Sequence, residues 1–205
     1  MNRHLAALQI WLLSFLICIG TVILSFVRLD IAVADWSFRN IHWLNALGEG
    51  AGSVVLLSVE TGVVLSLVVA RLVHGRISRH SEATALACLT SMCAFTVNIG
   101  ILKICFGVPS TQAVLMHGAH HTFHFLAGSP DCSFPSGHMV LAGAFAGVFM
   151  KLYSSSIWVF SALLSFGAAL LVFGGWHFVS DVIAGTFIGV SVGLLAGELW
   201  RLHSN

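Results

Sequence analysis

Charged residues are scarce in this sequence, and apolar ones are far more numerous than a soluble core requires. Asp, Glu, Lys and Arg make up 8% of the 205 residues, 58% are hydrophobic, and the mean hydropathy is +0.96. This composition predicts an integral membrane protein. The few Lys and Arg form no basic run, so nothing indicates a nucleic-acid partner. The sequence also lacks internal repeats, a Gly-rich nucleotide loop and the cysteine spacing of a zinc finger.

The hydrophobic runs are continuous and do not alternate with polar residues, which favours helices over the strands of a membrane barrel. Each run is close to the roughly 20 residues that cross a bilayer as a helix. We therefore predict an all-α, polytopic membrane protein with a single domain over residues 1–205, and Arg3 precedes a first run that we expect to be a retained anchor. The six predicted spans are 9–27, 51–72, 83–105, 135–153, 156–175 and 181–200.

The positive charges predict the orientation of these spans. One set of helix ends carries Arg3, Arg71, Arg76, Arg79, Lys151 and Arg201, and the other set carries Arg28, Arg39 and Lys103. By the positive-inside rule both termini are cytoplasmic. Segments 28–50, 106–134 and 176–180 then lie on the outer face, which we expect to be the periplasmic face of a bacterial inner membrane.

The run Phe134-Pro-Ser-Gly-His138 begins one hydrophobic segment. Pro135 suits the first turn of a helix, where the backbone N–H groups that follow lack partners and can bind a phosphate. Gly137 allows close approach of an anion, Ser136 adds a hydroxyl donor, and His138 can protonate a leaving oxygen. The alternative is an ordinary helix start with a surface imidazole.

A second imidazole, His177, begins the last hydrophobic segment, and Asp181 follows four residues later. On a helix the two side chains share a face, so the carboxylate can hold one ring nitrogen and raise the nucleophilicity of the other. A simple helix-start pair is the alternative. Lys103 places an ammonium at the end of an apolar span, where charge is costly and often functional, although a lysine that snorkels to the interface fits as well.

Three segments together resemble the signature of the type 2 phosphatidic acid phosphatase family, which is related to the vanadium haloperoxidases. They are Lys103–Pro109, Phe134–His138 and Gly175–Gly185. Their order and spacing, with the predicted helices, cover nearly the whole chain. The resemblance implies a six-helix membrane fold and a phosphatase that acts on a phosphorylated lipid without a metal or other cofactor.

The resemblance also implies a role for each matching residue. His177 matches the nucleophile that forms a phosphohistidine, Asp181 the residue that orients it, and His138 the acid that protonates the leaving group. The residues that match the phosphate-binding positions are Lys103, Ser136 and Gly137.

Two arginines of the family pattern are absent. The first motif normally closes with Arg-Pro, where this sequence has Ser110-Thr111, and Leu171 stands six residues before His177 in place of the second arginine. A phosphoryl-transfer site depends on cationic donors, and loss of one preorganised donor costs on the order of a hundredfold in rate.

Three accounts of this loss remain open. In the first, a histidine segment supplies substitute donors, with His120 and His121 as candidate substrate ligands and Arg28 or Arg39 as further cations. The four imidazoles of that segment would share one face of a short helix: His117, His120, His121 and His124. In the second account, the protein binds a lipid phosphate without turnover. In the third, the histidines hold a transition metal, as in a metal transporter. A polar loop that titrates with pH is the plainest alternative.

Further residues stand out within the spans. Glu60 lies near the middle of the second span, where an ionisable group is a functional candidate or a protonated acid bonded to a neighbouring helix, and Asn98 is expected to join helices in the same way. Small residues at helical spacing predict close packing inside the protein: Gly143 and Gly147, and Gly185, Gly189, Gly193 and Gly197. Cys105 and Cys132 both lie near the outer face, where they could form a disulfide.

The sequence therefore predicts a membrane phosphatase that hydrolyses a lipid phosphomonoester or pyrophosphate through a phosphohistidine. The alternative is a weak or inactive relative that binds lipid phosphate head groups.

Overall fold

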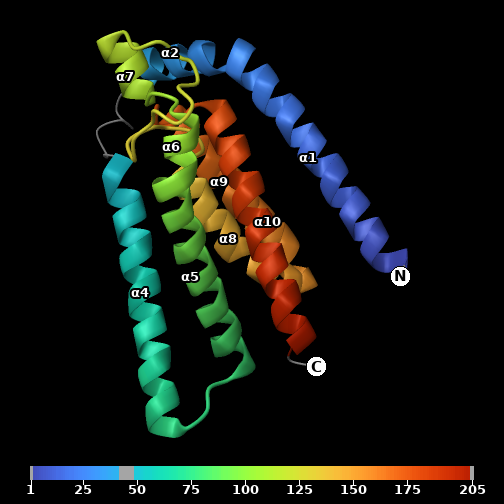
Figure 1. Ribbon diagram of the computed structural model, residues 1–205. Helices are drawn as coiled ribbons and strands as arrows, with labels where there is room; N and C mark the ends of the chain where they lie inside the picture. Colours follow the sequence, from blue (N-terminus) through green and yellow to red (C-terminus); the bar gives the residue numbers. More distant parts are fainter. Residues whose placement is uncertain (1, 42–48, 204–205) are drawn as a thin grey trace.

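The computed structural model describes residues 2–41 and 49–203, and within these ranges every regular element is a helix (Figure 1). The longer helices are α1 Asn2–Arg28, α2 Asp30–Asn40, α4 Glu49–His74, α5 Arg79–Val97, α8 Gly137–Leu152, α9 Ile157–Phe173 and α10 Val179–His203. The shorter ones are the π-helical turn Asn98–Leu102, α6 Lys103–Phe106, α7 Thr111–His117 and a 3-10 turn, Ser154–Ser156.

The prediction of an all-helical membrane protein is confirmed, with a qualification on the number of spans. Five helical segments of the described chain are long and apolar enough to cross a membrane: Leu8–Arg28, Gly52–His74, Arg79–Phe106, Ser154–Phe173 and Val179–His203. The fourth predicted span, 135–153, falls short, because α8 has only 16 residues there. More than half of its residues are buried, because α5 and α10 pack along it, so its surroundings are largely protein rather than lipid.

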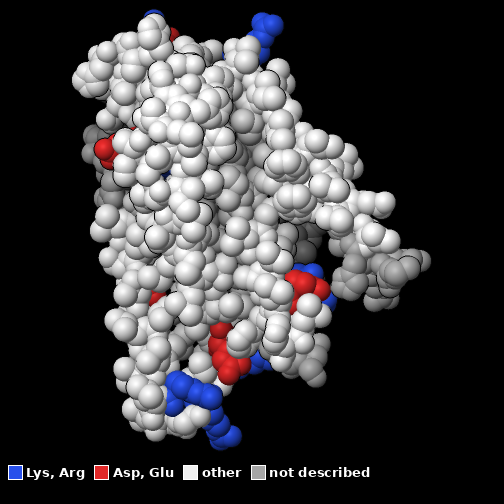
Figure 2. All heavy atoms as spheres, in the orientation of Figure 1, with Lys and Arg blue, Asp and Glu red and all other residues white. Residues whose placement is uncertain are grey.

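The two ends of the bundle differ in what they carry. The α2 and α7 helices lie at one end, while the α4–α5 connection and the end of α10 lie at the other, and α1 leads away from α2 toward that second end (Figure 1). The second end holds Arg71, Arg76, Arg79, Lys151 and Arg201, and some of these basic groups are visible at the bottom of Figure 2. This segregation follows the predicted pattern, and the assignment of the basic end to the cytoplasm remains a prediction.

The glycine stripe of α10 packs against α8, as the sequence predicted. A Cβ added at Gly185 would lie 2.5 Å from the Ser136 carbonyl oxygen, and one at Gly189 would lie 2.5 Å from that of Val140. On the facing helix, a Cβ at Gly147 would lie 2.6 Å from the Val190 oxygen. Because these neighbours are backbone atoms that cannot rotate away, only glycine permits this helix separation, and α8 and α10 carry the catalytic candidates at their first turns.

We expect Gly193→Ala to lower the stability of the protein by about 1–3 kcal/mol, the usual cost of overpacking. The added methyl group would collide with the Ala144 carbonyl oxygen and force α10 away from α8. Thermal unfolding in detergent measures the effect. Gly167→Ala in α9 is the matched control, since nothing lies within 4 Å of its added Cβ, and its unfolding temperature should be unchanged or slightly raised. Equal melting of the two variants would contradict the packing argument.

Glu60 joins α4 to the bundle through Ser91 of α5. The Ser91 hydroxyl lies 2.9 and 3.1 Å from the two carboxyl oxygens and 3.0 Å from the Leu141 carbonyl oxygen. A hydroxyl has one hydrogen and cannot donate to the carboxyl and the carbonyl at once. The hydroxyl is within donor distance of the carboxyl, and the Leu141 carbonyl oxygen competes for the same hydrogen. Glu60 therefore fits the predicted acid that hydrogen-bonds a neighbouring helix.

Candidate active site

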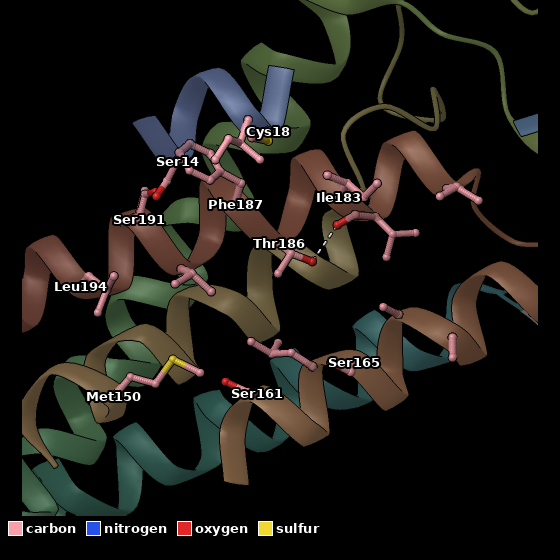
Figure 3. A pocket seen from close by; sticks show the side chains of 18 of the residues that line it. Ser14, Cys18, Met150, Ser161, Ser165, Ile183, Thr186, Phe187, Ser191 and Leu194 are labelled. Atoms are coloured by element: carbon pink, nitrogen blue, oxygen red, sulfur yellow. Dashed lines mark hydrogen bonds between the residues drawn. The ribbon is translucent and has the colours of Figure 1, made fainter. Parts of the chain in front are cut away.

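A long apolar groove lies between α1, α9 and α10, and it is not where phosphate chemistry can occur. Its volume is about 1520 Å³. The polar groups along it are hydroxyls, one thiol and the indole N–H of Trp11, and the hydroxyls include those of Ser14, Ser161 and Thr186 (Figure 3). The described residues that line it include no His, Asp, Glu, Lys or Arg. The groove therefore suits hydrocarbon, and the candidate catalytic groups lie elsewhere.

The structure brings His138 and His177 together at the end of the bundle that carries α2 and α7. His138 lies in the first turn of α8, and His177 in the loop that leads into α10. Their ring centroids are 5.7 Å apart with the rings inclined at 72°. His177 is only 2% exposed, whereas His138 is half-buried. Gly52 of α4 lies beside His138, since a Cβ there would be 3.3 Å from its Nε2 atom.

Asp181 holds the His177 loop as well as its ring. One carboxyl oxygen, Oδ2, lies 3.4 Å from His177 Nδ1 and accepts a hydrogen bond of 2.9 Å from the Phe178 backbone N–H. The expected pairing is present, but its basis differs from the prediction, because α10 begins at Val179 and His177 precedes it. The ring reaches Asp181 because Gly175 adopts a left-handed φ of 68° and Leu171 accepts the His177 N–H at 3.2 Å.

Ser136 is the N-cap of α8, which begins at Gly137. Pro135 therefore lies before the cap, whereas the sequence analysis had placed it in the first turn. The Ser136 hydroxyl accepts a long hydrogen bond of 3.5 Å from the Met139 N–H. Its own N–H donates to the Asp181 carbonyl oxygen at 3.1 Å. This N–H is therefore not one of the outward donors that the sequence analysis expected. A Cβ on Gly137 would lie 3.0 Å from the Phe95 ring, a tight contact that favours a small residue there.

Lys103 follows a change in helix geometry. The turn from Asn98 to Leu102 is π-helical, a rare form that is frequent at functional sites, and Lys103 begins α6 directly after it. Asn98 is fully buried, and its side-chain amide donates to the Pro135 carbonyl oxygen at 3.2 Å. This bond confirms that Asn98 joins helices, and it ties the Lys103 segment to the start of α8.

The four histidines between 117 and 124 do not share a helix face, so that prediction is wrong. The α7 helix ends at His117 because Gly118 takes a left-handed φ of 69°, and the chain continues as a loop. His120 and His124 are exposed, whereas the His121 side chain is 8% exposed. Within the described ranges no three His, Cys, Asp or Glu side chains are grouped as metal ligands.

Cys105 and Cys132 are free thiols, so the disulfide that the sequence analysis considered is absent.

Asp30, which the sequence analysis missed, is buried against the first turn of α10. Its Oδ1 accepts a hydrogen bond of 2.9 Å from the Ser180 N–H, and its Oδ2 accepts one from the Ser180 hydroxyl. His121 Nε2 lies 3.4 Å from the same Oδ2. The only sequence signal for Asp30 was its position just after the first apolar span, in segment 28–50, which the sequence analysis had assigned to the outer face. The partners lie 150 residues apart in the chain, and no local pattern connects them.

The positions of the two expected arginines have local structural functions. Ser110 caps α7, its hydroxyl accepting the Ala113 N–H, and Leu171 lies in an apolar cluster with Met139 and Val182. Arg39 is directed to Asp35, 2.9 Å away on the exposed side of α2.

A family model described as the PAP2 superfamily matches residues 84–202, which is more than half of the chain. This chain belongs to the PAP2 superfamily. The matched range contains every sequence-predicted site residue, whereas α1, α2 and α4 precede it. Comparison with curated proteins gives no match, and comparison with solved structures gives none. PAP2 superfamily proteins are generally phosphatases, so membership of the superfamily suggests a function of the phosphatase type.

Proposed function

We propose that this PAP2 protein hydrolyses a lipid phosphomonoester or pyrophosphate through a phosphohistidine formed on His177. The observation that carries the proposal is the pairing of His138 with His177 at a ring separation of 5.7 Å, with Asp181 on the Nδ1 side of His177. Two imidazoles this close can both reach one phosphoryl group that lies beside them. The candidate span Val179–His203 begins two residues after His177, so a lipid head group at that end of the span would meet the site.

The first step forms a bond between His177 and phosphorus. Asp181 accepts the Nδ1 hydrogen, so the lone pair on Nε2 attacks phosphorus. The bond from phosphorus to the lipid oxygen breaks, and the imidazolium of His138 gives that oxygen its proton. The products of this step are the free lipid alcohol, or the lipid monophosphate from a pyrophosphate, and a phosphohistidine.

The second step returns the enzyme to its first state. His138, now neutral, takes a proton from a water molecule whose oxygen attacks phosphorus. The N–P bond breaks, inorganic phosphate leaves, and His177 recovers its lone pair. Lys103, Ser136 and Gly137 are the proposed phosphate-holding residues, and exposed His120 is a further candidate donor at the same end. His121, which we had also predicted as a substrate ligand, has its Nε2 turned to Asp30.

The head group would be processed on the face that the charge bias assigns to the periplasm of a bacterial inner membrane. Among the described residues, the two positions where the family pattern has arginine hold no cation, which favours the binding protein as the second candidate function. Such a protein would hold a lipid phosphate without turnover.

Phosphate release from a panel of lipid phosphates distinguishes these candidates. Purified protein in lipid nanodiscs is offered phosphatidic acid, phosphatidylglycerol phosphate, an isoprenoid pyrophosphate and lipid A, each with and without a chelator. We expect release from at least one lipid, unchanged by the chelator. Saturable binding of a lipid phosphate without release would establish the second candidate, and activity abolished by the chelator and restored by a metal ion would contradict the proposed mechanism.

A further inference from the structure

Two carboxylates, from opposite ends of the sequence, hold the first turn of α10. Asp181 accepts the N–H of Phe178 at 2.9 Å, and Asp30 accepts the N–H of Ser180 at 2.9 Å. These N–H groups lack partners within their own helix, and a carboxylate is a favourable acceptor there. Asp181 belongs to the proposed reaction, whereas the proposed reaction has no use for Asp30.

Asp30 is 1% exposed, so its carboxylate must be compensated by donors inside the protein. Ser180 supplies two, its N–H and its hydroxyl. His121 Nε2 lies 3.4 Å from Oδ2, within ion-pair distance when the ring is protonated but too far for a good hydrogen bond. The other acid of this part of α2 is Asp35, which is half-buried and pairs with Arg39. The burial of Asp30 is therefore specific to its position.

His121 is also fixed by the residue that follows the nucleophile. Its ring lies between Phe26, at a centroid distance of 4.0 Å, and Phe178, at 4.3 Å. Phe178 is 1% exposed, so its ring is packed on all sides and His121 is one of its contacts. The His177 loop is thus held from one side by Asp181 and from the other by the Asp30–His121 pair.

We propose that Asp30 and His121 are positioning residues that align His177 with Asp181. This inference rests on the proposed function for its catalytic consequence. The contact between His177 Nδ1 and Asp181 is 3.4 Å, so a small displacement of residues 178–181 would break it. By anchoring Ser180, Asp30 sets the position of that turn, and His121 supports both Asp30 and Phe178. A segment outside the matched family range would thereby complete the site.

The test compares Asp30→Ala, the isosteric Asp30→Asn and His121→Gln with the control Asp35→Asn, which removes a charge from the exposed side of α2. Each protein is labelled with ¹⁵N-histidine, and the His177 ring signals are identified by their loss in His177→Gln. We expect these signals to shift in Asp30→Ala and His121→Gln, because the tautomer of His177 is no longer fixed. They should stay in place in Asp35→Asn, and the His203 signals at the far end of α10 should stay in place throughout.

Kinetics supply the second measurement. For Asp30→Ala we expect kcat to fall about tenfold to a hundredfold, because the hydrogen bond between His177 and the Asp181 carboxylate would be lost. The KM should stay within about threefold of wild type. Asp30→Asn retains the shape and one acceptor, so it should fold and give a smaller loss. The double variant Asp30→Asn, His121→Gln should lose less than the product of the single losses, since the two residues act as one unit.

Unmoved His177 signals in both Asp30 variants would overturn the inference, whatever the turnover. So would a rise in KM at constant kcat, which would place Asp30 against the substrate. If wild-type protein releases no phosphate from any lipid, the proposed function fails, while the His177 signals still decide whether Asp30 and His121 position the ring. Shifted signals for His203 as well would show a general loss of structure and would also overturn the specific role.

Discussion

Replacing His177 with Gln should abolish phosphate release, with a loss of about 10⁴-fold or more, as is typical when a covalent nucleophile is removed. Gln retains a polar side chain of similar length but offers no lone-pair nitrogen to phosphorus. The site should otherwise remain, because the Phe178 N–H, not the ring, makes the shorter bond to Asp181. The variant should therefore still bind a lipid phosphate.

The covalent intermediate provides the sharper measurement. Wild-type protein mixed with a ³²P-labelled lipid phosphate and quenched in alkali should retain label that acid removes, as expected for a phosphoramidate, and His177→Gln should retain none. His203→Gln is the matched control, since His203 is an exposed histidine at the opposite end of α10. Turnover or labelling that survives in His177→Gln would end the proposed mechanism.

Replacing His138 with Ala should have an effect that depends on the leaving group. A lipid alkoxide is a poor leaving group and requires a proton, so we expect kcat/KM on the lipid to fall about 10²- to 10⁴-fold, the usual contribution of a general acid. An aryl phosphate such as p-nitrophenyl phosphate departs without a proton and should lose much less in the phosphorylation step. The ratio of the two losses isolates the role of His138 as an acid.

Burst kinetics separate the two steps for this variant. With the aryl phosphate, His138→Ala should release one equivalent of nitrophenol rapidly and then turn over slowly, because the second step needs His138 as the base that activates water. The control substitution is His203→Ala, an exposed histidine at the opposite end of α10, which should show no such burst. Equal losses on lipid and aryl substrates, with no burst, would indicate that His138 binds the phosphate instead of moving protons.

The absent arginines acquire a physical meaning from the structure. Leu171 contributes its backbone, since its carbonyl oxygen accepts the N–H groups of Trp176 and His177 at 3.1 and 3.2 Å. Its side chain belongs to the apolar cluster beneath the site. The position therefore shapes the His177 loop without adding a charge, and the proposed phosphate contacts depend on Lys103 and on the first turn of α8.

The sequence by itself determined the membrane-spanning helices, the end of the bundle at which the catalytic candidates lie, and the packing role of the glycine stripe. Each of these depends on composition or on spacing within one helix, which are local properties. The pairing of His177 with Asp181 was also predicted, but from a shared helix face, whereas His177 lies in the loop before α10.

Tertiary structure decided the rest. Asp30 and Ser180 meet across 150 residues, and the 5.7 Å separation of His138 and His177 depends on how α8 and α10 pack. The expected histidine helix fails because the left-handed Gly118 ends α7, after which loop contacts bring His121 to Asp30. Such outcomes depend on long-range packing and on compensation of a buried charge. Both contribute free energy only when distant segments are in contact, so no local sequence pattern predicts them.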